Sequence, residues 1–192
     1  MSRVARELNN PYAILVSTLL SLRTRDKVTY EATYRLLDIA PDAKTLAETD
    51  CGTIAEAIYP VSFYRNKAES LVKIGGILCR QYNGKVPTAQ DNLLELPGVG
   101  RKTANLVLNL AFGVSAICVD THVHRISNRI CWVDTRTPEE TEYALMEFLP
   151  REYWIQVNEV FVAYGQHVCK PVSPLCSNCP IDMACCKKGV YV

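Results

Sequence analysis

Four cysteines near the C-terminal end of the chain are spaced like the ligands of a metal centre. Cys169, Cys176, Cys179 and Cys185 are separated by six, two and five residues. Closely spaced thiolates in a reducing compartment indicate zinc or an iron–sulfur cluster, and this spacing is unlike a zinc ribbon, which pairs two Cys-x2-Cys knuckles. It also differs from the ferredoxin spacings. We therefore expect a cofactor that stabilises a small tail rather than an electron carrier.

The remaining cysteines do not suggest a disulfide framework. The chain contains nine cysteines, an odd number, and it lacks the features of a secreted protein. Cys186 is interpreted as a spare thiol beside Cys185, and exchange of the two as ligands stays open. The other four lie among apolar neighbours and are interpreted as buried small hydrophobic side chains: Cys51, Cys79, Cys118 and Cys131.

A turn rich in glycine separates two predicted helices in the middle of the chain. It consists of Pro97, Gly98, Val99, Gly100 and Arg101. Glycine permits positive φ and lets another backbone come close, and the first N–H groups of the second helix have no partner within that helix. Such a turn favours a phosphate oxygen, so it predicts DNA binding without base-sequence readout. The alternative is an ordinary turn in which the glycines only permit tight packing.

Lys102 follows this turn directly, in the first turn of the second helix. A positive charge is disfavoured at a helix N-terminus, which favours the free amine. A free amine attacks carbon electrophiles and forms a Schiff base, so Lys102 is a candidate nucleophile. The alternative is a solvated surface lysine.

Asp120 begins the next predicted helix, where a carboxylate is a favourable N-cap. An ionised carboxylate near a lysine nucleophile would stabilise positive charge that develops on a sugar ring. The alternative is an N-cap with no further role. His122 and His124 lie two residues apart and cannot share a helix face, so we do not interpret them as metal ligands.

Composition narrows the class of protein. The chain has 192 residues, 48% hydrophobic and 21% charged, which excludes a disordered protein, a collagen-like fibre and a coiled coil. Its net charge of +1 gives no support for DNA binding, so any such binding depends on local arrangement. No apolar run reaches the roughly 18–20 residues that span a bilayer, and no signal peptide is evident. We expect a cytoplasmic protein.

Hydrophobic periodicity predicts an all-α protein built of short helices, the first of them central because few of its residues are polar. The segment 115–119 is an apolar connector that periodicity also allows as a strand. The predicted helices span 12–21, 27–39, 66–82, 90–96, 101–112, 121–132, 138–148 and 152–167, with a further short helix that starts between 50 and 53 and ends at 59.

Taken together and in this order, the glycine turn with Lys102, the Val-Asp-Thr-His segment at Asp120 and the cysteine spacing resemble the endonuclease III family. This family belongs to the helix-hairpin-helix DNA glycosylases. The resemblance runs from about Pro11 to Cys185. It is specific because it rests on three motifs whose chemical roles are unrelated.

The resemblance implies a fold of two α-helical lobes with a DNA-binding cleft between them. Residues 10–114 would form a six-helix barrel with the helix-hairpin-helix motif at about 90–112. Residues 1–9 and 115–192 would form the iron–sulfur cluster domain, which also carries Asp120.

The resemblance also implies a bifunctional DNA glycosylase and abasic-site (AP) lyase in base excision repair. Lys102 would be the nucleophile, Asp120 its acidic partner, and Cys169, Cys176, Cys179 and Cys185 the ligands of a 4Fe-4S cluster. The partner would be double-stranded DNA with a damaged base or abasic site, bound by a nucleoid-associated monomer. A flipped-out oxidised or ring-saturated pyrimidine, of the thymine glycol type, would be removed, and β-elimination would nick the strand 3′ to the abasic site.

Further residues match DNA-contact positions of the family. Arg23 stands where the family usually has a glutamine that fills the gap left by the flipped base, and Arg25 follows two residues later. Phe63 matches a bulky apolar residue that intercalates beside the extruded base. An aromatic side chain that packs a loop against the core is the alternative for Phe63. His122 and the glycine turn complete the predicted DNA-binding set.

Two other functions stay open. A monofunctional adenine- or thymine-mismatch glycosylase would share the turn and the cluster, but such relatives lack the lysine that Lys102 matches. A non-enzymatic DNA-binding or redox module would bind DNA without base release.

Overall fold

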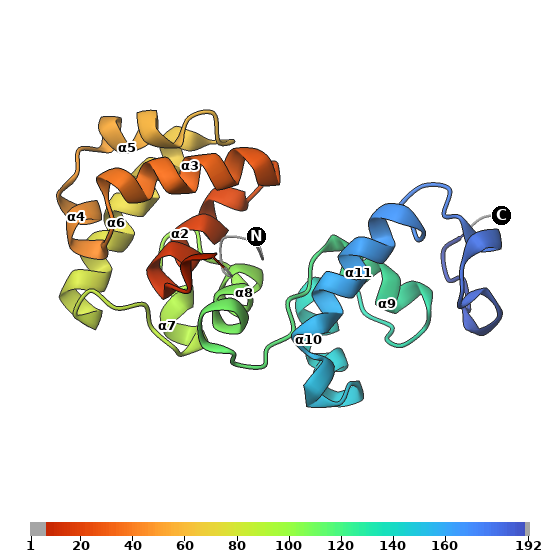
Figure 1. Ribbon diagram of the computed structural model, residues 1–192. Helices are drawn as coiled ribbons and strands as arrows, with labels where there is room; N and C mark the ends of the chain where they lie inside the picture. Colours follow the sequence, from red (N-terminus) through yellow and green to blue (C-terminus); the bar gives the residue numbers. More distant parts are fainter. Residues whose placement is uncertain (1–6, 191–192) are drawn as a thin grey trace. The chain divides into compact units, whose positions relative to one another are not determined.

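The computed structural model describes residues 7–190 and divides the chain into two units, with the division between Val114 and Ser115 (Figure 1). Every regular element in the described range is a helix, and residues 115–119 are irregular. The predicted all-α class is therefore confirmed, and no strand forms between residues 7 and 190. Residues 1–6, part of the N-terminal segment expected in the cluster lobe, lie outside the described residues. Glu7 accepts hydrogen bonds of 2.7 Å from Tyr30 and Tyr34 of the first unit.

Helix α2 is the central element of the first unit. Its residues from Tyr12 to Leu20 are all buried, and it packs against α3, α6 and α8. Asn10 caps its N-terminus by accepting a hydrogen bond from the backbone N–H of Tyr12 at 2.9 Å. The unit consists of α2 (Pro11–Ser21), α3 (Asp26–Ile39), α4 (Ala43–Glu48), α5 (Cys51–Ile58), α6 (Tyr64–Tyr82), α7 (Gln90–Leu94) and α8 (Arg101–Phe112).

The short helix α4 is absent from the sequence prediction. Its six residues are too few to show a helical period, and its one local signal is Asp42, which accepts a hydrogen bond from the backbone N–H of Thr45 at 2.8 Å. Tertiary packing holds α4 against α6. A Cβ built at Gly75 of α6 would lie 2.8 Å from the carbonyl oxygen of Ala43, so glycine is what lets the two helices approach.

The second unit is built on α9 (Thr121–Arg129), α10 (Pro138–Phe148) and α11 (Gln156–His167), with α9 packed against both others. Its core includes Ile117, Val123, Leu145 and Phe161. Helix α9 is shorter than predicted because the chain leaves helical geometry at Cys131, whose φ is 58°. Short 3₁₀ turns complete this unit at Arg151–Tyr153, Cys176–Asn178 and Asp182–Ala184. No helix within residues 7–190 has the length and apolar character needed to cross a membrane.

Candidate DNA-binding and catalytic site

The glycine turn between α7 and α8 has the two glycines in different roles. Gly98 has a φ of +79°, the left-handed region that favours glycine, whereas Gly100 is an extended N-cap residue with a φ of −97°. A Cβ built at Gly100 would meet no atom within 4 Å, so this glycine leaves the backbone open to a close approach. Val99 is buried and anchors the turn through a 3.0 Å hydrogen bond from its N–H to the carbonyl of Leu96.

Lys102 lies in the first turn of α8 with its side chain exposed, beside the half-buried Arg101. The helix begins at Arg101, as predicted, and ends at Gly113, whose φ of 63° stops it. Local sequence therefore fixes Lys102 in the first turn of a helix whose N-terminal backbone is accessible at Gly100.

Asp120 is the N-cap of α9 in the second unit. Its Oδ1 accepts hydrogen bonds from the backbone N–H groups of His122 at 2.8 Å and Val123 at 2.9 Å. The carboxylate is half-buried, so its position is set by the helix start that it caps. This role is compatible with a second role in catalysis because capping engages Oδ1 and keeps the carboxylate in place.

His122 is half-buried in the same turn. Its Nδ1 lies 3.1 Å from a terminal guanidinium nitrogen of Arg125, and the same nitrogen donates to the carbonyl of Cys169 at 2.8 Å. The ring therefore sits in a network that joins the start of α9 to the end of α11.

Two of the predicted DNA-contact residues, Arg23 and Phe63, lie close together in the first unit. Arg23 and Arg25 are exposed, and Phe63 exposes 61% of its surface, so the ring does not pack a loop against the core. The guanidinium carbon of Arg23 lies 5.8 Å from the centre of the Phe63 ring. The tertiary structure thus pairs a cation and an aromatic ring that are 40 residues apart in sequence.

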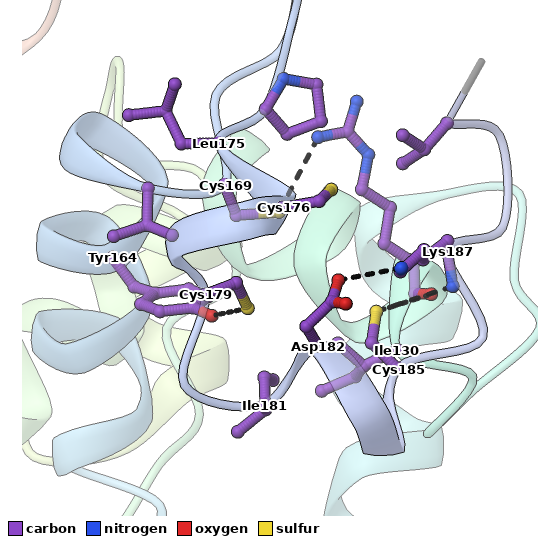
Figure 2. Close-up of a pocket in the computed structure, with 14 residues that line it drawn as sticks. Ile130, Tyr164, Cys169, Leu175, Cys176, Cys179, Ile181, Asp182, Cys185 and Lys187 are labelled. Carbon is purple, nitrogen blue, oxygen red and sulfur yellow. Dashed lines mark hydrogen bonds and ion pairs between the residues drawn. The ribbon is translucent and has the colours of Figure 1, made fainter. Parts of the chain in front are cut away.

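The four predicted cluster ligands line one pocket in the second unit (Figure 2). Each thiol comes from a different point of the tail: Cys169 follows α11, Cys176 begins a 3₁₀ turn, Cys179 follows that turn, and Cys185 follows the last 3₁₀ turn. The hydroxyl of Tyr164 lies 2.6 Å from the sulfur of Cys179, and the backbone N–H of Lys187 donates to the sulfur of Cys185 at 3.4 Å.

Four thiols that share one pocket have the chemistry of an iron–sulfur cluster site, because each iron of a 4Fe-4S cubane takes one thiolate. As the side chains stand, no group of three or more His, Cys, Asp or Glu side chains within residues 7–190 is arranged to hold a metal ion.

Arg129 was assigned no role from the sequence, yet it organises this pocket. It is buried at the end of α9 and donates to the carbonyls of Lys170 at 2.6 Å and Pro171 at 2.8 Å, and to the sulfur of Cys169 at 3.5 Å. These contacts are about 40 residues away along the chain, and no local pattern signals them.

The interpretation of Cys186 as a spare thiol is wrong. Cys186 is bonded to Cys131, with their Cα atoms 6.1 Å apart, a usual separation for a disulfide. Cys131 is exposed rather than buried, while Cys51 and Cys79 are half-buried and Cys118 is fully buried. Of the four cysteines predicted to be buried, only Cys118 is therefore fully buried.

Comparison with known proteins decides the family. Residues 16–151 match the HhH-GPD superfamily of base excision DNA repair proteins. The chain is 47% identical to the endonuclease III of Thermotoga maritima over 176 residues, which cover 92% of this chain and 83% of the relative. The chain belongs to the endonuclease III family. Members of this family are DNA glycosylases of base excision repair with AP lyase activity, and that is the function of this chain.

Other relatives and solved structures agree with this assignment. Endonuclease III homolog 1 of Arabidopsis thaliana, a chloroplastic protein, is 43% identical over 91% of this chain, which spans about half (48%) of that longer protein. A structure of a trapped endonuclease III–DNA covalent intermediate matches with a TM-score of 0.86 at 36% identity, covering 93% of this chain and 84% of that one. A thermostable thymine-DNA glycosylase matches with a TM-score of 0.84 at 25% identity, covering 95% of this chain and 86% of that one. The two-lobed helical fold of endonuclease III is therefore the fold of this chain.

Proposed function

We propose that this member of the endonuclease III family removes oxidised or ring-saturated pyrimidines, of the thymine glycol type, from double-stranded DNA and nicks the strand through a Schiff base on Lys102. The observation that carries this proposal is the exposed Lys102 in the first turn of α8, two residues after the open backbone at Gly100. A DNA phosphate bound by the N–H groups at this helix start would bring its strand next to the amine of Lys102.

The proposed reaction runs in two covalent steps. The Nζ of Lys102 attacks C1′ of the damaged nucleotide, the bond from C1′ to the base breaks, and the base leaves with a proton. Cleavage of the C1′–O4′ bond, with a proton taken up by O4′, then opens the sugar ring and gives the imine, which makes the C2′ hydrogen acidic. Loss of that proton and cleavage of the C3′–oxygen bond release the 3′ phosphate, and water then hydrolyses the imine and restores the amine.

In this proposal Asp120 supports the first step. Its carboxylate stabilises the positive charge that develops on the sugar ring as the base departs. The hydrogen bonds that it accepts from two backbone N–H groups hold it in one orientation.

We also propose that Cys169, Cys176, Cys179 and Cys185 hold a 4Fe-4S cluster, which would cross-link the tail of the second unit when bound. Four thiolates around a shared pocket support this assignment. The cluster would replace the hydrophobic core that this tail lacks, since many residues between Lys170 and Lys188 are exposed. The protein would act as a cytoplasmic, nucleoid-associated monomer.

Borohydride trapping on a duplex with an abasic site tests the lyase mechanism. The wild type should form a covalent protein–DNA adduct, because borohydride reduces the Schiff base to a stable amine. Lys102→Gln and Lys102→Ala should lose this adduct. Lys73→Met, which removes an exposed lysine from α6, should retain it and serves as the matched control.

The same assay separates the alternatives. Base release from a mismatch without an adduct would identify a monofunctional glycosylase, the function suggested by the likeness to the thymine-DNA glycosylase. An adduct that survives in Lys102→Gln would assign the nucleophile to another amine.

A further inference from the structure

Lys67 of α6 has its ammonium group turned toward the end of α2. Its Nζ donates hydrogen bonds to the carbonyls of Leu20 at 2.9 Å and Leu22 at 2.7 Å, and lies 3.4 Å from the hydroxyl of Thr24. Carbonyls at a helix C-terminus carry partial negative charge, which a cation stabilises. Partial burial lowers the pKa of Lys67 to about 8, which means that burial of the ammonium group costs free energy. The hydrogen bonds to the two carbonyls offset part of this cost and keep the ammonium group in this position.

Ser62 makes a second connection between the same two segments. Its hydroxyl donates to the carbonyl of Arg23 at 2.7 Å, and its backbone N–H donates to the hydroxyl of Thr24 at 3.2 Å. The turn after α2 is therefore held at two points by the segment that starts α6, through Ser62 and through Lys67. These contacts join residues 38 to 47 positions apart in the chain.

The two held segments each present one exposed side chain in a left-handed backbone conformation. Arg23 has a φ of 55° and Phe63 a φ of 57°, which are uncommon values for residues other than glycine. Such conformations persist where the surroundings over-determine them, and they cluster at functional sites. The Arg23 guanidinium lies over the exposed Phe63 ring, so the strained positions point two large side chains into one place.

We propose that Lys67 and Ser62 are positioning residues that hold Arg23 and Phe63 as one preassembled wedge, which enters the duplex where a base has been extruded. This inference rests on the proposed function. A planar guanidinium stacks on bases and an apolar ring separates a base step, so the pair suits that gap. Fixing both side chains before binding lowers the ordering cost of insertion.

A purely structural role for Lys67, as a cap that stabilises α2, makes a different prediction. Loss of such a cap would weaken folding and affect every activity alike. Loss of the wedge geometry would slow extrusion of an intact base but spare a site whose base is already gone. The ratio of the two reactions therefore distinguishes the roles.

The first measurement uses the whole protein and needs no chemistry. A duplex carries a tetrahydrofuran abasic analogue opposite 2-aminopurine, whose fluorescence changes when a side chain enters the gap. The wild type and the Lys73→Met control should change the emission. Lys67→Met and Ser62→Ala should leave it near that of free duplex at saturating protein, and Lys67→Arg, which keeps a charged donor, should restore part of the change.

The second measurement compares two single-turnover rates. In Lys67→Met, release of a thymine glycol base should fall by about tenfold, the scale expected for losing hydrogen bonds from a charged donor. Nicking of a preformed abasic site should fall by less than about threefold, because no base has to be unstacked and unpaired there.

Each outcome decides something. Failure of the wild type to release a base or nick DNA, with a normal fluorescence change, would refute the proposed function and leave the wedge supported. A fluorescence change as large as that of the wild type in both Lys67→Met and Ser62→Ala would overturn the inference. An equal loss of the base-release rate and the nicking rate would also overturn it. If Lys67→Met does not fold, Ser62→Ala, which removes one hydroxyl, decides alone.

Discussion

Gly165 of α11 lies so close to His122 that a Cβ built at residue 165 would be 2.3 Å from Nδ1 of the His122 ring. The same Cβ would lie 2.8 Å from a guanidinium nitrogen of Arg125. Glycine at this position lets α11 pack directly over the first turn of α9. The turn that Asp120 caps is thereby held from its other side.

Gly165→Ala should therefore destabilise the second unit. The added methyl must displace His122 and Arg125, and overpacking of this kind costs about 1–3 kcal/mol. Urea unfolding measures the loss, and binding to a duplex with an abasic analogue should weaken in parallel because His122 moves. Wild-type stability in this variant would show that His122 and Arg125 rearrange freely and that α11 does not pack tightly on the first turn of α9.

The two glycines of the turn before α8 should respond differently to alanine. Gly98→Ala places a side chain at a positive φ and should cost roughly 1–2 kcal/mol of stability. Gly100→Ala meets no neighbouring atom and should change stability by less than about 0.5 kcal/mol. Its methyl group would nevertheless stand where a phosphate approaches, so affinity for DNA at fixed salt should drop. Undiminished affinity in Gly100→Ala would argue against phosphate binding at this turn.

Substitution of Asp120 separates capping from catalysis. Asparagine caps a helix about as well as aspartate, so Asp120→Asn should keep its thermal stability, whereas Asp120→Ala should lose about 1 kcal/mol. Both variants lack the negative charge and should release damaged bases far more slowly than the wild type. Rates and melting temperatures measured on the same samples test this. A fully active Asp120→Asn would reduce Asp120 to a structural cap.

Loss of one proposed cluster ligand should remove iron from the protein. Cys185→Ser should lower the iron and acid-labile sulfide content and loosen the tail, which limited proteolysis after residue 168 would detect. Cys51→Ser, a thiol of the first unit, is the matched control and should retain the wild-type content. Equal iron in both variants would contradict the assignment of Cys185 as a ligand.

Local patterns were sufficient where the deciding contacts lie within a few residues. The start of α8 at Arg101, the cap at Asp120 and the end of α6 at Asn83 each depend on hydrogen bonds or backbone angles in one turn. The spacing of the four tail cysteines is local in the same sense. Helix α4 escaped prediction because its six residues are held by packing against α6 rather than by a period of their own.

What the sequence by itself determined is thus the helical class, the glycine turn with Lys102, the cap at Asp120 and the thiol set, because each follows from nearest neighbours along the chain. Only the tertiary structure decided that Lys67 holds the Arg23 turn, that Arg129 reaches Cys169 and that Cys131 pairs with Cys186. Those contacts join residues about 40 to 55 positions apart, and the packing that closes such long loops leaves no periodic trace in the sequence.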